Sequence, residues 1–200
     1  MASHNYGYFT ASSISPFLTG KGDVLLKGGE TAAIEIAKER LSLDGLVSPE
    51  EPWQGNDATE WGNQHEADAL LRYEQQNFVS VVDRQKGVAQ GYLSCSPDGY
   101  VGEEGLVEAK CPYATKNHME YMLNPESLRD QYNDQCQFQL MLTGRKWCDL
   151  ISYDPRWAEP LDLITVRILP DPQWQDRCRS RIVQAESIIN QVITIVKSRL

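Results

Sequence analysis

The sequence predicts one α/β domain in which a central mixed β-sheet is flanked by helices. Segments with helical periodicity and segments with strand signals follow one another along the chain, a pattern typical of this fold class. The chain has 200 residues, and 41% of them are hydrophobic, which is enough for one domain with a substantial core. Neither internal repeats nor low-complexity segments divide it. We therefore expect a single domain over residues 1–200.

Capping and turn residues place the elements in order. Asn56 resembles a helix N-cap, with Glu60 as its reciprocal capping-box acid. Gly144 closes a second long helix, and Asp171-Pro172 opens an amphipathic C-terminal one. The first helix is expected to begin near residue 12. Further helices are expected over residues 31–41, 56–76 and 128–143, and from about residue 171 onward. The expected strands are 79–88, 92–95, 106–110, 147–153 and 161–169, with a flexible glycine-rich connection at 20–29 and a loop at 45–57.

The most informative stretch is a predicted β-hairpin over residues 96–112. A glycine-flanked turn leads into a strand over 106–110. Side chains alternate along a strand, so Glu108 and Lys110 point to the same face. Asp98 begins the other arm between a proline and a glycine, which aim its carboxylate across the hairpin toward Glu108. Two carboxylates and one ammonium therefore converge.

This group has the composition of a metal site for phosphodiester hydrolysis. Mg²⁺ prefers one or two carboxylates, here Asp98 and Glu108, together with waters and a phosphate oxygen. The carbonyl of Ala109 is a further candidate ligand. We expect two Mg²⁺ ions, with Mn²⁺ as a substitute, to neutralise charge and lower the pKa of a bound water. Lys110 would orient that water and stabilise the transition state, so the hairpin indicates a nuclease.

A purely structural interpretation of the hairpin stays open at this point. Asp-Gly is a common turn, and average residue usage gives a Glu-x-Lys triplet roughly once by chance in a chain this long. The triplet is informative because it lies on a predicted strand, after an aspartate preceded by proline.

Two predicted helices offer polar groups to the same site. Glu66 lies on an otherwise small and apolar stripe with Ala69 and Tyr73, where an ionised carboxylate needs a cation or a donor. Gln135 shares a helix face with Cys136, and its amide can bind a water or a phosphate oxygen. Alternatively, Glu66 reaches water or pairs with an arginine, and Gln135 is an ordinary surface residue.

Several motifs then resemble a known family. Pro97-Asp98 followed by Glu108-Ala109-Lys110 resembles the active-site signature of the PD-(D/E)xK nucleases. The longer motif from Ser96 to Pro112 is similar to the phage lambda exonuclease branch, also called the viral recombinase family. Further segments match in order between about residues 9 and 170: Thr10-Ala11-Ser12, Trp61 to Glu66, Gln135-Cys136-Gln137 leading to Met141-Leu142-Thr143, and Tyr153-Asp154-Pro155-Arg156.

The resemblance implies a restriction-endonuclease-like fold with a three-layer α/β core. It also implies Mg²⁺-dependent digestion of the 5′ strand of linear duplex DNA, which leaves 3′ single-stranded overhangs for recombination. It also implies a ring-shaped homotrimer that encircles the product, and a single-strand annealing protein as partner. By position, the catalytic residues are Lys110, Glu66 and Gln135, and the metal ligands are Asp98, Glu108 and the Ala109 carbonyl. Ser12 and Lys116 align with phosphate-binding positions.

Charge and the N-terminal segment bear on how such a protein would hold DNA. A formal net charge of −9 and a pI near 4.8 argue against binding through broad electrostatic attraction. We expect local contacts instead, with Ser12, Lys116 and Arg156 as candidate DNA or phosphate ligands. Family members can carry an Arg before Thr-Ala-Ser that hooks the 5′ phosphate, whereas this chain has Asn5-Tyr6-Gly7-Tyr8-Phe9.

Other features argue against other classes of protein. The five cysteines form no C-x-x-C pair, which favours reduced buried thiols, and the three histidines lack the spacing of metal ligands.

No apolar run approaches the length of a membrane span, and the start lacks a secretory signal, so we expect no membrane association and a cytoplasmic location. The C-terminal helix is apolar around much of its circumference, which suits either its own core or another subunit.

Two alternatives to an exonuclease stay open. A structure-specific or restriction-type endonuclease would share the same core. A non-catalytic module that binds DNA ends would keep the scaffold, although retention of Asp98, Glu108 and Lys110 argues against it.

Overall fold

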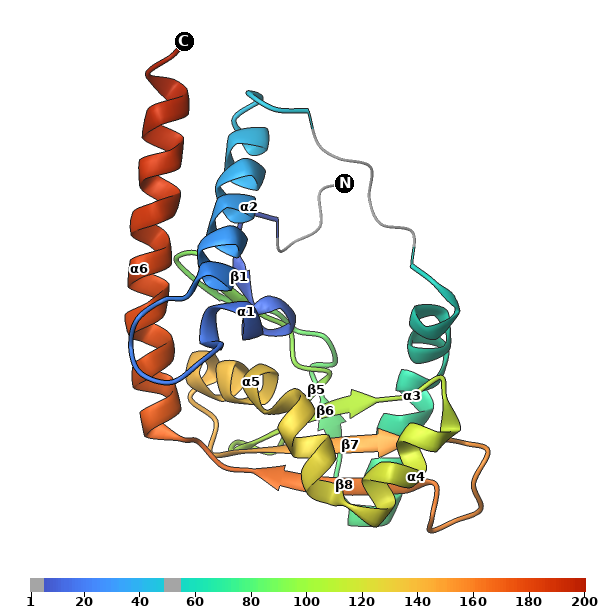
Figure 1. The fold of residues 1–200 in the computed structure, drawn as a ribbon. Helices are drawn as coiled ribbons and strands as arrows, with labels where there is room; N and C mark the ends of the chain where they lie inside the picture. Colours follow the sequence, from blue (N-terminus) through green and yellow to red (C-terminus); the bar gives the residue numbers. More distant parts are fainter. Residues whose placement is uncertain (1–5, 49–54) are drawn as a thin grey trace. The chain divides into compact units, whose positions relative to one another are not determined.

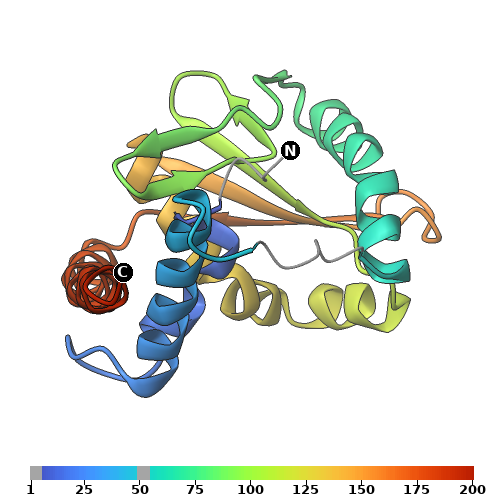
Figure 2. The same ribbon diagram turned by 90° about the horizontal axis from the view of Figure 1, so that it is seen from above.

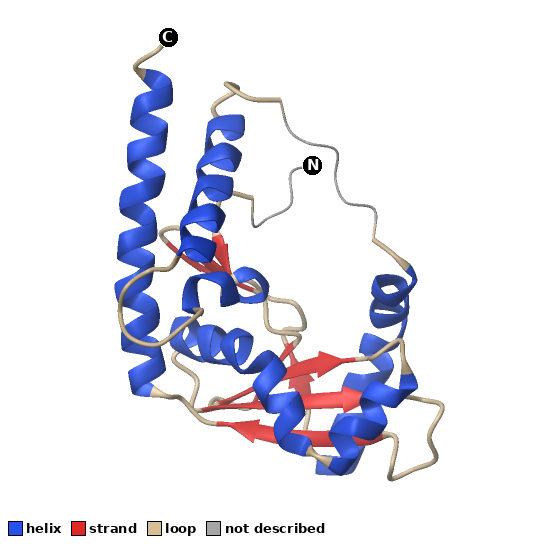
Figure 3. Cartoon of the chain, viewed as in Figure 1, coloured by secondary structure: helices blue, strands red, loops and turns tan. Residues whose placement is uncertain are grey.

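The computed structural model describes residues 6–48 and 55–200, so Asn5 and residues 49–54 of the predicted loop at 45–57 lie outside the described residues. The chain divides into two compact units. The first comprises residues 1–52, 89–95 and 171–200, and the second comprises 53–88 and 96–170. Figure 3 distinguishes the helices, strands and loops of both. The expectation of one domain over residues 1–200 stays a prediction.

A five-stranded mixed sheet forms the centre of the second unit. The strand order is β2-β5-β6-β7-β8, with β6 parallel to β7 and the other neighbours antiparallel. The strands are β2 (Val81–Val82), β5 (Gly99–Val101), β6 (Gly105–Lys110), β7 (Trp147–Tyr153) and β8 (Leu163–Ile168). The predicted hairpin is present as β5 and β6, with Gly99 opposite Val107, and the predicted mixed α/β architecture is confirmed.

Helices cover both faces of this sheet. Helix α3 (Asp57–Asn77) lies on one face, and α4 (Thr115–Leu123) with α5 (Pro125–Thr143) lies on the other (Figure 2). Leu106 belongs to the core cluster under α4 and α5, whereas Val107 belongs to the cluster under α3. Adjacent residues of β6 therefore face opposite layers, which confirms the predicted alternation.

Local signals account for the ends of the long helices. Asn56 is the N-cap of α3, and its side chain accepts a hydrogen bond from the backbone N–H of Thr59 at 3.1 Å. Gly144 closes α5 in the left-handed conformation that glycine tolerates best. Helix α5 begins at Pro125 rather than near Leu128, because proline suits the first turn of a helix.

Two expectations for the second unit need correction. A single strand over 79–88 was expected, but only β2 and the start of β3 (Val88–Gln90) are extended there. The chain turns between them, with positive φ angles at Asp83 and Gln85. Helix α4 was not predicted; it has only nine residues, and its N-cap residue, Ala114, makes no side-chain capping hydrogen bond.

The first unit is built around two long helices. Helix α2 (Lys27–Leu43) and α6 (Pro172–Lys197) run side by side (Figure 1). Asp171 caps α6 by accepting from the backbone N–H groups of Gln173 and Trp174, as the sequence indicated. The smaller elements are β1 (Phe9–Thr10), η1 (Ala11–Ser13), α1 (Ser15–Leu18), β3 and β4 (Leu93–Cys95), and the three strands form a sheet of order β1-β4-β3.

A buried arginine organises the loop after α1. Arg181 on α6 is fully buried and donates to the backbone carbonyls of Phe17, Thr19, Gly20 and Gly22. The buried guanidinium needs hydrogen-bond acceptors, and these four carbonyls provide them.

The glycine pair before α2 was expected to be flexible, which is wrong. Gly28 and Gly29 lie in the first turn of α2, and Gly29 is buried. A side chain at Gly29 would overlap Leu25, so this glycine permits close packing rather than flexibility.

We predict that Gly105→Ala destabilises the protein. A Cβ atom at Gly105 would overlap the ring of Trp147, its register partner on β7, and overpacking of this kind costs about 1–3 kcal/mol. The free energy of unfolding in denaturant measures the effect. Gly62→Ala is the control, because its Cβ would have no described atom within 4 Å and alanine favours a helix by up to about 1 kcal/mol relative to glycine. Equal stability of Gly105→Ala and wild type would contradict the prediction.

Candidate active site

The carboxylate of Glu108 lies at the centre of the candidate site. It is 2% exposed, near the end of β6, and faces α5. Three donors surround it: Lys110 Nζ and Gln135 Nε2 lie 2.7 and 2.5 Å from Oε1, and Gln139 Nε2 lies 2.7 Å from Oε2. Both carboxylate oxygens are therefore hydrogen-bonded, which offsets the cost of burying the charge.

Lys110 is held beside Glu108 in its charged form. Its Nζ also donates to Gln135 Oε1 at 3.1 Å and lies 4.8 Å from the centre of the Tyr132 ring. Burial would lower the pKa of Lys110, but the charge of Glu108, its hydrogen bond and the charge of Asp98 raise it. Lys110 is thus a fixed cation rather than a base at neutral pH.

Asp98 reaches across the hairpin as the sequence indicated. Its Oδ2 accepts from the backbone N–H of Ala109 at 2.7 Å. Burial raises the pKa of Asp98 well above its ordinary value, and the charges of Glu108 and Glu66 raise it further. The Ala109 hydrogen bond and Lys110 oppose this effect without cancelling it. Asp98 therefore belongs to a cluster of carboxylates that is short of positive charge.

Glu66 approaches the same cluster from α3, on the other side of the sheet. Its Oε1 accepts from Gln85 Nε2 at 2.8 Å, so it is neither paired with an arginine nor left to water alone. Glu66 and Lys110 line a pocket of about 250 Å³. The rest of its wall is Thr59, Gly62, Asn63, Ala109, Cys111, Pro112, Tyr121 and Tyr132.

Gln139 is the residue of this site that the sequence did not single out. Its side chain is fully buried, and its Oε1 has no hydrogen-bond partner among the described residues, so the amide is oriented by its bond to Glu108. The available signal was its position four residues after Gln135, which places both amides on one face of α5.

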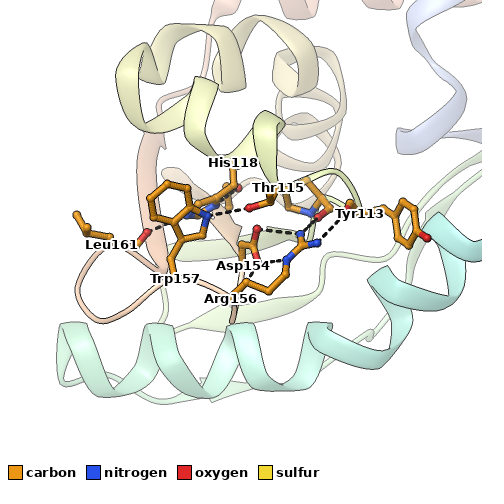
Figure 4. A network of polar contacts seen from close by, with 9 residues as sticks. Tyr113, Thr115, His118, Asp154, Arg156, Trp157 and Leu161 are labelled. Atoms are coloured by element: carbon orange, nitrogen blue, oxygen red, sulfur yellow. Dashed lines mark hydrogen bonds and ion pairs between the residues drawn. The ribbon is translucent and has the colours of Figure 1, made fainter.

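The three candidate phosphate ligands lie in different surroundings. Ser12 is exposed in η1 of the first unit, with its Oγ 3.4 Å from Thr10 Oγ1. Lys116 is exposed in the first turn of α4. Arg156 is bound to Asp154 and to backbone carbonyls of the segment after β6 (Figure 4). The phosphate-binding roles of these residues stay predictions.

The cysteines are free thiols, and all except Cys111 are buried. Burial raises the pKa of Cys111 to about 12, with help from the charges of Glu66 and Asp98. Its thiol stays protonated at neutral pH, which argues against a nucleophilic role.

The donor set fits a hard divalent cation. Within residues 6–48 and 55–200, no group of three or more His, Cys, Asp or Glu is arranged to hold a metal ion. Mg²⁺ does not need such a group, because it binds through one or two carboxylates and keeps several waters. Burial is the main cause of the raised pKa of Asp98, and the negative charges of Glu108 and Glu66 add to it; a bound cation would offset those charges.

Comparison with known proteins identifies the family. The model of the YqaJ-like viral recombinase domain matches residues 10–146. The chain belongs to this family. The match includes Glu66, Asp98, Glu108, Lys110 and Gln135 and ends before Arg156.

Solved structures agree with this membership. An alkaline exonuclease (LHK-Exo) from Laribacter hongkongensis is 25% identical with a TM-score of 0.79, and the match covers 98% of this chain and 96% of that one. The same enzyme in complex with dAMP gives 26% identity and a TM-score of 0.80, over 98% and 94% of the two chains. A phage-related exonuclease from Haemophilus somnus 129PT, 16% identical over 94% and 96%, shares the fold with a TM-score of 0.80.

The comparison with curated protein sequences gave no match. Across the part of the chain that the structure describes, none of the helices combines the length and the apolar character that a membrane span requires.

We predict that Asp98→Asn stabilises the metal-free protein and weakens its response to Mg²⁺. The isosteric amide can still accept from Ala109, but it removes one of the charges that repel Glu108 and Glu66. In EDTA the melting temperature should rise by about 2–4 °C, the shift that about 1 kcal/mol produces at this size. Added Mg²⁺ should raise the melting temperature of wild type more than that of the variant.

Asp130→Asn, an exposed change on α5, is the control and should match wild type in both conditions. A lower melting temperature for Asp98→Asn in EDTA, or an unchanged response to Mg²⁺, would contradict the assignment of this carboxylate.

Proposed function

We propose that this protein is a metal-dependent DNA exonuclease. The observation that carries the proposal is the convergence of Asp98, Glu108 and Lys110 at the end of β6, with Gln135 in direct contact. Membership of the YqaJ-like viral recombinase family and the likeness to alkaline exonucleases at 25–26% identity support it.

The metal would be held by Asp98, Glu108 and the carbonyl of Ala109. Two Mg²⁺ ions, or Mn²⁺ in their place, would neutralise the phosphodiester and lower the pKa of a bound water. Lys110 contributes a protonated ammonium that donates to the attacking water or to a phosphate oxygen. Gln135 fixes the positions of the Lys110 and Glu108 side chains relative to each other, because its amide accepts a hydrogen bond from Lys110 and donates one to Glu108. Glu66 supplies a further carboxylate from the opposite layer.

The same proposal includes the direction and the biological context. Digestion starts at the ends of linear duplex DNA, removes the 5′ strand and leaves 3′ single-stranded overhangs for recombination. The active form is a homotrimeric ring around the product, and a single-strand annealing recombinase receives the overhang. The family description as a viral recombinase domain supports this context.

The decisive experiment is digestion of a linear duplex that carries distinct labels at its two 5′ ends and its two 3′ ends. With Mg²⁺, the 5′ labels should be released and the 3′ labels retained, and EDTA should stop the release. Covalently closed plasmid should stay intact. Cleavage of closed plasmid would instead indicate an endonuclease, and inactivity with Mg²⁺ and Mn²⁺ on all substrates would indicate a binding module.

We predict that Lys110→Ala lowers the cleavage rate by at least about 10²-fold, because it removes a cation aimed at the reacting phosphate. Binding to duplex DNA in EDTA should change little, since one phosphate contact is a small part of the total. Lys86→Ala is the control, because Lys86 is an exposed lysine paired with Asp83. Wild-type turnover by Lys110→Ala would exclude the role assigned to this residue.

A further inference from the structure

Arg156 is tied to Asp154 by three hydrogen bonds. Its Nε lies 2.7 Å from Asp154 Oδ1, its Nη2 lies 2.9 Å from Oδ2, and its backbone N–H donates to Oδ1 at 3.1 Å. The Asp154 side chain is fully buried. Burial alone would raise the pKa of Asp154, but hydrogen bonds from Arg156 and Thr115 outweigh it and lower that pKa. The pair is therefore a charged bidentate one with a fixed geometry.

The other side of the guanidinium holds the backbone that follows β6. Arg156 Nη1 donates to the carbonyl of Tyr113 at 3.0 Å, and Nη2 donates to the carbonyl of Pro112 at 3.1 Å. Cys111, Pro112 and Tyr113 belong to no helix or strand, and Cys111 directly follows Lys110. Four of the five N–H groups of the guanidinium are thus used within the protein.

The face of the same guanidinium packs on α3. It lies 4.5 Å from the centre of the Trp61 ring, which in turn meets the Tyr113 ring edge-on with 6.2 Å between ring centres. Trp61 precedes Glu66 by little more than one helical turn. Arg156 therefore links the ends of β6 and β7 to the helix that carries Glu66.

A second set of contacts anchors the far end of the same segment (Figure 4). Trp157 Nε1 donates to Thr115 Oγ1 at 2.9 Å. The fully buried His118 lies 2.9 Å from the carbonyl of Leu161 through Nε2 and 2.9 Å from Ser152 Oγ through Nδ1. Since a carbonyl only accepts, Nε2 carries a proton and donates it to Leu161. Residues 112–118 are thus held along their length by the chain around β7.

We infer that Asp154 and Arg156 form a positioning pair that fixes the Pro112–Tyr113 segment, and through it Lys110 and the Ala109 carbonyl. Arg156 acts on the reaction through this segment and is not a ligand of a DNA phosphate. This inference rests on the proposed function for its effect on cleavage. This positioning role requires the planar guanidinium of an arginine, because the single ammonium of a lysine cannot reproduce four directed hydrogen bonds.

The test compares Arg156→Lys, Arg156→Gln, Asp154→Asn and the double variant Arg156→Gln with Asp154→Asn. A positioning pair predicts that all three single variants lose about 10²-fold in kcat, as expected for a small misplacement of a catalytic group. The double variant should lose no more than the worst single one. The dissociation constant for duplex DNA in EDTA, and its salt dependence, should equal the wild-type values. Arg129→Lys, a surface arginine paired with Glu126, is the control and should behave as wild type.

The opposite pattern would overturn the inference. A phosphate ligand predicts that Arg156→Lys keeps most activity, whereas Arg156→Gln weakens DNA binding and reduces the salt slope by about one. Asp154→Asn should then differ from Arg156→Gln, and the losses should add.

Hydrogen exchange tests the pair without reference to activity. Deuterium uptake over residues 111–118 should rise in Arg156→Lys, while uptake over β8, residues 163–168, stays at the wild-type level. Uptake that rises equally in both peptides, or in neither, would overturn the inference. If wild type lacks nuclease activity, the proposed function fails, but the exchange result still decides whether the pair fixes the segment.

Discussion

The burial of the Glu108 carboxylate is the constraint on which the second unit depends. A charge that is 2% exposed is costly unless donors meet it, and three donors do so: Lys110 from β6 and Gln135 and Gln139 from α5. Helix α5 must therefore lie against β6 in one register, because a shift of one residue would move both amides away from the carboxylate. The apolar contacts around Leu106 and Leu140 provide the hydrophobic stabilisation of that packing, and the polar contacts select its register.

The central strand also explains why the carboxylates gather at one place. Strand β6 has hydrogen-bonded neighbours on both sides, so its backbone is rigid, and its side chains alternate between two helical layers. Glu108 and Lys110 face α5, while Asp98 enters from the neighbouring arm and Glu66 from α3. The positive charge of Lys110 only partly balances this cluster. In the proposed function, a divalent cation would correct this imbalance, and rigid strand positions would suit the placement of catalytic groups.

The segment after β6 is less regular and needs other support. Its carbonyls at Pro112 and Tyr113 find donors in Arg156, whose charge is in turn balanced by the buried Asp154. An arginine that looks available for DNA in the sequence is therefore largely engaged within the protein. Residue type alone does not separate a phosphate ligand from a structural cation; the partners of its N–H groups do.

Local chemistry was sufficient for much of the fold and for the core of the site. Asn56, Gly144 and Asp171 mark helix ends through contacts with their own neighbours, and the hairpin follows from turn residues and strand alternation, so Asp98, Glu108 and Lys110 could be grouped in advance. Local signals failed at residues 83–87, where non-glycine residues adopt positive φ, and at α4, which has no capping side chain. The bond between Gln139 and Glu108, the bond between Gln85 and Glu66, and the engagement of Arg156 were decided only by tertiary structure, because each joins residues 19 or more positions apart. Such contacts depend on how strands and helices pack against one another, whereas sequence periodicity gives only the face of an element on which a side chain lies, not the residue that it meets.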